Sequence, residues 1–215
     1  MSNKKQLQKR ATKIARLLTR MYPRAKVFLN HSTSFELLVA VMLSAQCTDK
    51  KVNEVTKKLF KKYKTINDYV RAGKTIETIK AFENDIKQTG FFRTKTKHIL
   101  QTAEIIKIKY KGRVPHTMEE LVALPGVGRK TANIILESVF GIVVGIPVDT
   151  HVFRLAHTFG LSDKKTPNGV EADLCEIIPK RYWAGISYRL ISYGREFCTA
   201  RKHNHLLCPL SKIEV

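Results

Sequence analysis

Apolar residues recur at every third or fourth position over most of this chain, which is the spacing of one face of an α-helix. The pattern predicts helices over residues 35–45, 52–60, 99–108 and 131–140. No run alternates convincingly between apolar and polar residues, although residues 141–148 are compatible with a short extended segment. Glycines and prolines separate the helical stretches without a fixed period. The chain is therefore predicted to be all-α, with about ten helices.

The first predicted helix combines an apolar stripe with a strongly basic outer face. The first acidic residue of the chain is Glu36. We interpret the stretch before Glu36 as containing an amphipathic helix, and its exclusively positive charge favours a surface that faces phosphate groups. A transit peptide and a simply solvated basic surface are the alternatives. The stripe consists of Leu7, Ala11, Ile14, Leu17, Leu18 and Met21.

Composition narrows the class of protein. The 215 residues include 39 Lys+Arg and 18 Asp+Glu, a net charge of +21 that points to nucleic acid as the partner. Hydrophobic residues make up 43% of the chain, enough for a folded core. The four cysteines do not form a secreted disulfide framework, and no apolar run is long enough to span a membrane. We therefore expect a cytoplasmic, nucleoid-associated protein that has neither a membrane partner nor an organelle address.

The most informative segment reads EELVALPGVGRKTA over residues 119–132. A helix ends before Pro125, two glycines flank Val127, and a second helix begins at once. Gly126 and Gly128 are expected to supply positive φ and to let a phosphate approach the backbone, while the new helix N-terminus offers unpaired N–H groups. Val127 is expected to fill the gap between the helices. The pattern is typical of a helix-hairpin-helix that grips DNA phosphate without reading sequence, the alternative being an ordinary glycine-rich turn.

Lys130 lies in the first turn of this second helix. Composition alone favours a phosphate contact. The sharper hypothesis is a nucleophilic amine, which a lysine becomes only when it is desolvated or crowded by positive charge. The helix N-terminus and Arg129 both act in that direction. Further on, Asp149 stands at a predicted helix start, where it can be an N-cap, a catalytic carboxylate or both. His151 is interpreted as a hydrogen-bonded structural histidine or a pH-active group.

Several motifs in one order then resemble a known family. LPGVGRKTAN is followed by GIPVDTHVFR, which places Asp149 nineteen residues after Lys130. FELLVAVMLSAQCTD, GFFRTKTKHI and YGREFCTARK, over residues 35–49, 90–99 and 193–202, complete the set. Together they resemble the helix-hairpin-helix DNA glycosylases, and specifically endonuclease III, over nearly the whole chain.

The resemblance implies two helical lobes that flank a DNA cleft. One lobe is a six-helix barrel over residues 27–142, with the helix-hairpin-helix at about 117–138. Residues 1–26 and 143–215 form the second lobe, with a degenerate iron–sulfur region over 198–215. The implied partner is double-stranded DNA that contains damaged bases or abasic sites, and the implied state is a monomer.

The resemblance also implies a bifunctional DNA glycosylase/AP lyase of base excision repair, acting on oxidised pyrimidines. Lys130 is the nucleophile that attacks C1′ and forms a Schiff base, from which β-elimination cuts the strand. Asp149 is the catalytic carboxylate. Gln46 fills the space left in the duplex, and Phe91 is a wedging side chain or, alternatively, a core residue. The other implied DNA contacts are Gly126, Val127, Gly128, Arg129, Thr131 and His151.

Two other functions remain open at this point. Adenine-mismatch glycosylases resemble this chain but lack the lysine, and they carry an acid where this chain reads SAQCTD. A catalytically silent or altered-specificity helix-hairpin-helix protein would only bind DNA. A protein of that kind has no use for the carboxylate of Asp149.

Most members of the family hold a [4Fe–4S] cluster through Cys-x6-Cys-x2-Cys-x5-Cys near the C-terminus. Aligned on Cys198, this chain has His205, Cys208 and Glu214 at the other three positions. Only two thiolates remain, so we expect no cofactor and no metal. The alternative is a residual iron–sulfur site, or a zinc site made by Cys198, Cys208 and one of His203 and His205, which lacks a fourth ligand.

Without a metal, the C-terminal tail has to be held by apolar packing. The residues available for this role are Leu206, Leu207, Leu210 and Ile213.

Overall fold

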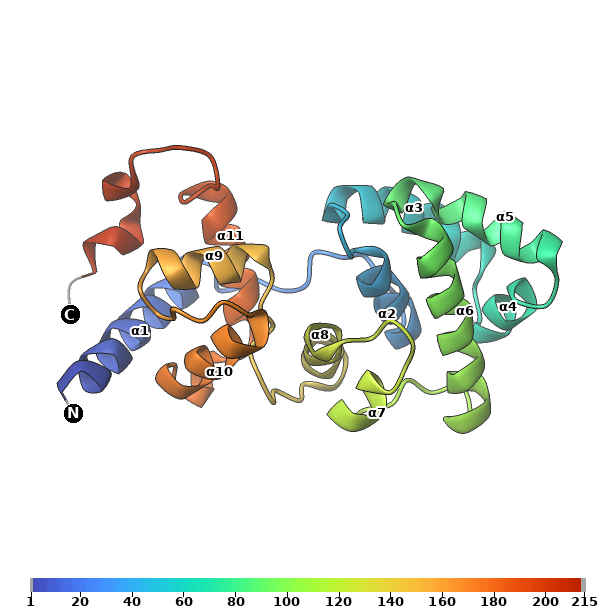
Figure 1. Ribbon diagram of the computed structural model, residues 1–215, viewed down its shortest axis with the longest axis horizontal. Helices are drawn as coiled ribbons and strands as arrows, with labels where there is room; N and C mark the ends of the chain where they lie inside the picture. The colour runs from blue at the N-terminus through green and yellow to red at the C-terminus, as the bar shows by residue number, and fades with distance from the viewer. Residues whose placement is uncertain (1, 214–215) are drawn as a thin grey trace. The chain divides into compact units, whose positions relative to one another are not determined.

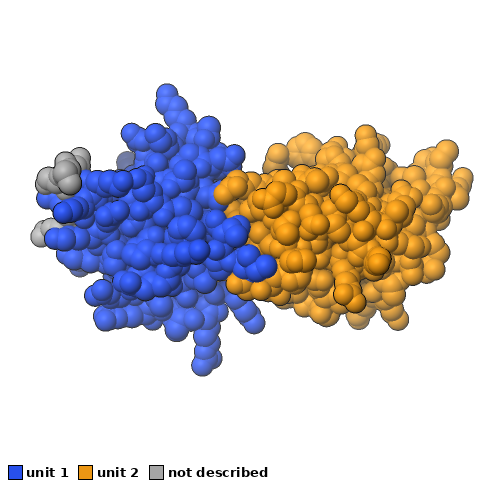
Figure 2. Space-filling model, turned by 90° about the horizontal axis from the view of Figure 1, so that it is seen from below, with its two compact units in different colours: residues 1–27, 142–215 blue, residues 28–141 orange. Residues whose placement is uncertain are grey.

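The computed structural model describes residues 2–213, and every regular element in that range is a helix (Figure 1). The predicted all-α class is confirmed, and residues 141–148 form a loop rather than a strand. The chain divides into two compact units, coloured separately in Figure 2. Unit 2 is residues 28–141, and unit 1 combines the described residues before 28 with those from 142 on. None of the described helices is long and apolar enough to cross a membrane.

Unit 2 is built around one helix that is buried along almost its whole length. In this helix, α2 (Ser34–Leu43), Phe35 and residues 37–43 are all buried. Thr33 and Glu36 close its first turn with a reciprocal capping box, which satisfies N–H groups that a buried helix end leaves unpaired. The helix packs against three neighbours in unit 2, namely α3, α6 and α8.

The other elements of unit 2 surround α2. They are α3 (Asp49–Lys62), α4 (Ile66–Ala72), α5 (Ile76–Ile86), the 3-10 helix η1 (Lys87–Thr89), α6 (Phe92–Lys109), α7 (Met118–Val122) and α8 (Arg129–Phe140). An aromatic cluster joins several of them, because Tyr69 lies 5.0 Å from Phe35 and 5.8 Å from Phe82, ring centre to ring centre, in edge-to-face geometry.

Unit 1 joins the two ends of the described chain. It contains α1 (Ser2–Met21), α9 (Thr150–Thr158), α10 (Pro167–Ile177), the 3-10 helix η2 (Lys180–Tyr182), α11 (Ile186–Glu196), and the 3-10 helices η3 (His205–Leu207) and η4 (Pro209–Lys212). The predicted first helix is α1, and it packs on α10 and α11. Ala11, Ile14 and Leu18 of its stripe are buried, while Lys13 and Arg16 face outward.

Candidate functional site

Helices α7 and α8 form a tight hairpin joined by the turn over residues 124–128. Leu124 and Val127 are buried, and the N–H of Val127 donates to the Leu124 carbonyl at 3.1 Å. From α6, the hydroxyl of Thr102 donates to the Pro125 carbonyl at 3.0 Å. The burial of Val127 agrees with the expectation that it fills the space between the helices. The turn is therefore anchored on its inner side and open on its outer side.

The two glycines of the turn differ in what requires them. Gly126 has a φ of +75°, and a Cβ there would lie 2.7 Å from Nδ1 of His98. Gly128 has a φ of −92°, and a Cβ there would meet no atom of the described chain within 4 Å. The expectation that both glycines supply positive φ is therefore wrong for Gly128. The fold needs a glycine at 126, whereas at 128 the missing side chain only leaves the outer surface bare.

Helix α8 begins directly after this bare position. Gly128 is its N-cap and has no side chain that could accept from the N–H groups of the first turn. The first turn contains no acidic residue, and Arg129 and Lys130 are both exposed. Lys130 is thus crowded by a basic neighbour and by the positive end of the helix dipole, but the chain itself does not desolvate it. Thr131 follows, half-buried.

Gln46 and Phe91 share an unusual backbone. Both adopt the left-handed conformation, with φ of 54° and 47°, which costs energy for any residue other than glycine. Both side chains are exposed, Phe91 to 65%, so the interpretation of Phe91 as a core residue is wrong. Together with His98 and Gly126 they line one hollow of unit 2. Sequence patterns carry no signal for such backbone strain, although strain of this kind clusters at functional sites.

The side chain of Lys95 holds the backbone next to the turns at Gln46 and Phe91. Its ammonium donates to the carbonyl of Leu43, at the end of α2, at 2.8 Å and to the carbonyl of Thr89 at 2.7 Å. The residue is only 6% exposed, and desolvation by burial lowers the pKa of its side chain. Leu43 lies three residues before Gln46, and Thr89 lies two residues before Phe91. One buried cation thus connects the backbones that carry both strained residues.

Asp149 belongs to unit 1 and is the N-cap of α9. Its Oδ1 accepts from the N–H of Val152 at 2.8 Å, while Oδ2 accepts no hydrogen bond within the described residues. The loop before it is fixed by the hydroxyl of Ser187, which donates to the Pro147 carbonyl at 2.6 Å. His151, half-buried in the first turn of α9, forms no hydrogen bond in the described part of the chain. Its interpretation as a hydrogen-bonded structural histidine therefore does not hold there.

The comparison with known proteins decides the family. A sequence model of HhH-GPD superfamily base excision DNA repair proteins matches residues 39–180. The chain belongs to the HhH-GPD superfamily. It is 44% identical over 202 residues to endonuclease III of Synechocystis sp., covering 94% of this chain and 89% of that protein. It is also 44% identical over 191 residues to endonuclease III of Bacillus subtilis, covering 88% and 84%.

Solved structures agree with this assignment. A non-covalent endonuclease III–DNA complex matches with a TM-score of 0.87 and 40% identity, over 95% of this chain and 93% of that one. A trapped endonuclease III–DNA covalent intermediate matches with the same TM-score and identity, over 94% and 93%. The predicted family is confirmed, and with it the enzyme class. This HhH-GPD protein is a DNA glycosylase/AP lyase of base excision repair.

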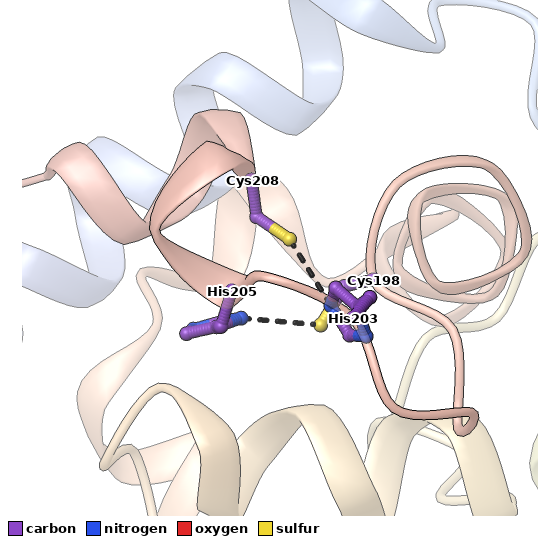
Figure 3. A group of neighbouring side chains, drawn as sticks. All are labelled: Cys198, His203, His205 and Cys208. Atoms are coloured by element: carbon purple, nitrogen blue, oxygen red, sulfur yellow. Dashed lines mark hydrogen bonds between the residues drawn. The ribbon is translucent and has the colours of Figure 1, made fainter.

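The prediction that this HhH-GPD chain holds no metal is wrong. Near its C-terminus, ligand atoms of Cys198, His203, His205 and Cys208 all lie within 4.8 Å of one another (Figure 3). His205 begins the 3-10 helix η3 and His203 lies two residues before it, whereas the sequence motif counted only His205. Cys198 and Cys208 are buried, and burial together with the adjacent Cys198 raises the pKa of the Cys208 thiol. Glu214, the fourth aligned position, lies outside the described residues.

The apolar packing expected for the tail is also mostly wrong. Leu206 and Leu207 are 76% and 74% exposed, and Ile213 is half-buried. Only Leu210 is fully buried, and its N–H donates to the hydroxyl of Tyr193 at 3.0 Å. The described contacts of this segment are therefore those of the Cys/His group and of Leu210, not those of a leucine cluster.

The contrast between the two glycines can be tested by stability. Gly126→Ala should lower the free energy of unfolding by about 2 kcal/mol, because it forces a left-handed alanine against His98. Gly128→Ala should change it by no more than about 1 kcal/mol, the range of an N-cap substitution. Urea denaturation of both variants measures the difference. Equal losses in the two variants would contradict the assignment.

The contribution of Lys95 to stability can be tested against Lys97, an exposed lysine on the same helix. Lys95→Met keeps the length of the side chain but leaves two buried carbonyls without a donor, so the free energy of unfolding should fall by about 2–3 kcal/mol. Lys97→Met, at an exposed position, should change it by less than about 0.5 kcal/mol. Chemical denaturation followed by circular dichroism compares the two. A Lys95→Met protein as stable as Lys97→Met would show that the carbonyls need no cation.

Proposed function

We propose that Lys130 is the Schiff-base nucleophile of this enzyme and that its substrates are oxidised pyrimidines in double-stranded DNA. The observation that carries the proposal is the position of Lys130. It lies exposed in the first turn of α8, immediately after a bare glycine turn and beside Arg129. Similarity to a protein whose covalent DNA intermediate has been trapped supports a covalent mechanism.

In the proposed reaction the neutral amine of Lys130 attacks C1′ of the damaged nucleoside. The bond from C1′ to the base breaks, and the base leaves with the electron pair and takes up a proton. The bond from C1′ to the ring oxygen then breaks, and the oxygen takes up the proton lost from the attached nitrogen and becomes the hydroxyl on C4′. A protonated imine now joins Lys130 to the opened sugar. The imine acidifies the C2′ hydrogen, so removal of that proton expels the 3′ phosphate by β-elimination. Water finally hydrolyses the imine and returns the free lysine.

For Asp149 we propose electrostatic stabilisation of the positive charge that develops on the sugar. Its Oδ1 is engaged as the N-cap of α9, which fixes the rotamer of the side chain. Its Oδ2 remains available in the described structure. A carboxylate held in this way is oriented through one oxygen while the other stays accessible to substrate, so capping and catalysis are compatible roles.

The remaining residues are proposed to hold DNA with the target base out of the stack. The N–H groups around Gly128 and Arg129 bind a backbone phosphate, which positions the duplex without reading sequence. Gln46 and Phe91, exposed on strained turns, enter the space that the extruded nucleotide leaves. Val127, Thr131 and His151 are proposed to make further contacts with the DNA. The acting species is proposed to be a monomer that associates with the nucleoid through its net charge of +21.

The nucleophile can be identified by borohydride trapping on a duplex that contains thymine glycol or an abasic site. Reduction of the imine should leave a covalent adduct on Lys130, located by peptide mass spectrometry. Lys130→Gln should abolish the adduct and keep much of the DNA affinity, whereas Lys107→Gln on α6 should trap like the wild type. An undiminished yield of adduct in Lys130→Gln would remove this lysine from the mechanism.

The hairpin contact can be tested by binding to duplexes of different sequence. Gly128→Ala covers the outer surface with a methyl group, so affinity should fall by about 10–100-fold, the worth of one hydrogen bond to a charged group. The loss should be similar on every duplex, and log K should fall linearly with log[salt], by about 0.9 per phosphate neutralised. Gly73→Ala, whose Cβ meets only ordinary contacts, is the matched control. A loss confined to one flanking sequence would contradict a phosphate contact.

A further inference from the structure

We propose that Cys198, His203, His205 and Cys208 bind a single zinc ion in a closed tetrahedral site, in place of an iron–sulfur cubane. The four residues lie within one short segment after α11. Figure 3 shows the two contacts that link them, one from Cys208 to His203 and one from His205 to Cys198. The inference is independent of the activity proposed for Lys130.

The distances suit one ion. Zinc bonds of about 2.3 Å to sulfur and about 2.0 Å to nitrogen place the ligand atoms of a tetrahedron about 3.3–3.8 Å apart. Here the Sγ of Cys208 lies 3.3 Å from Nε2 of His203, and the Sγ of Cys198 lies 3.6 Å from Nδ1 of His205. All four ligand atoms fall within 4.8 Å of one another. A small inward adjustment therefore completes the coordination shell.

A cubane does not fit these residues. Four irons and four sulfides stand between the ligand atoms of such a cluster, so its ligands lie further apart than those of one ion. The described site offers two cysteine sulfurs and two imidazoles, and all four converge on one small space. Two thiolates and two neutral imidazoles around Zn²⁺ give a neutral site, and mixed Cys/His sets are common for structural zinc.

The surroundings of the site also orient its ligands. Nδ1 of His203 lies 2.8 Å from the carbonyl of Arg201, which can only accept, so Nδ1 carries the proton. The lone pair of Nε2 is thereby directed at the neighbourhood of Cys208, as in zinc sites whose second ring nitrogen donates to a carbonyl. Next to Cys198, the guanidinium of Arg154 lies 3.7 Å from Sγ and donates to the Cys198 carbonyl at 2.5 Å. Such a donor stabilises a coordinated thiolate.

The consequence is structural rather than catalytic. With four protein ligands, the ion has no open position for water or substrate. Its binding would close the loop from Cys198 to Cys208 and hold a segment in which Leu206 and Leu207 are exposed. Because the unfolded chain does not present such a site, the binding energy becomes folding energy of unit 1.

The first experiment is elemental analysis of the full-length protein after expression in medium that contains both zinc and iron. We expect about one zinc per chain, little iron and no absorbance near 400 nm. Replacement of zinc by cobalt(II) should produce the intense visible bands of a tetrahedral thiolate complex. About four irons per chain with a band near 400 nm would overturn the proposal, and so would a folded protein that retains neither metal.

Variants then assign the ligands. Cys208→Ser and His203→Ala should each reduce the zinc content to a small fraction of the wild-type value. Cys175→Ser, on α10 outside the group, should retain it. If a ligand variant fails to fold, zinc is instead titrated into metal-free wild-type protein against a chromophoric chelator. One tight site and a higher melting temperature are expected, and no binding in that titration would overturn the proposal.

Discussion

The hydrogen bonds from the ammonium of Lys95 to two backbone carbonyls are the interaction on which the two strained turns of unit 2, at Gln46 and Phe91, depend. Helix α2 is buried along its length, and its last residue, Leu43, is fully buried, so the Leu43 carbonyl needs a hydrogen-bond donor from the protein. A buried cation that serves the Leu43 carbonyl also reaches Thr89, so the end of α2 and the start of α6 are fixed to each other. The strained turns at Gln46 and Phe91 follow directly from these anchored points.

The two glycines of the α7–α8 hairpin differ in whether the fold requires them. At Gly126 the backbone is left-handed and His98 occupies the space of a side chain, so glycine is needed even without DNA. At Gly128 neither reason applies, and the bare backbone faces outward at the start of α8. Within the described residues, Gly128 serves only as the N-cap of α8, a position that other small residues also fill, so the packing of the protein would allow a side chain there.

The spacing of apolar residues and the positions of glycine and proline were enough to predict the all-α class, the amphipathic α1 and the α7–α8 hairpin, because these features depend on local sequence. They could not place Phe91, since an exposed aromatic on a strained turn and a buried aromatic look alike in a sequence. The cation at Lys95 was hidden among 39 basic residues, because burial depends on contacts between distant segments. The metal group was misjudged for a related reason. A motif counts positions along the chain, whereas the folded segment places His203, which the motif does not include, beside the two cysteines and His205.

The division of the chain has a consequence for its synthesis. Unit 2 is one continuous segment, so all of its helices have left the ribosome once residue 141 has emerged. Helix α1 is synthesised before unit 2, whereas the helices that it packs on, α10 and α11, are synthesised after unit 2. The apolar side chains of Ala11, Ile14 and Leu18 are therefore exposed to solvent until α10 and α11 have been synthesised. Unit 2 can fold in the meantime, because it is inserted between the two parts of unit 1. The nine lysines and arginines among the first 26 residues oppose aggregation during this interval, because the positive charges of neighbouring chains repel one another.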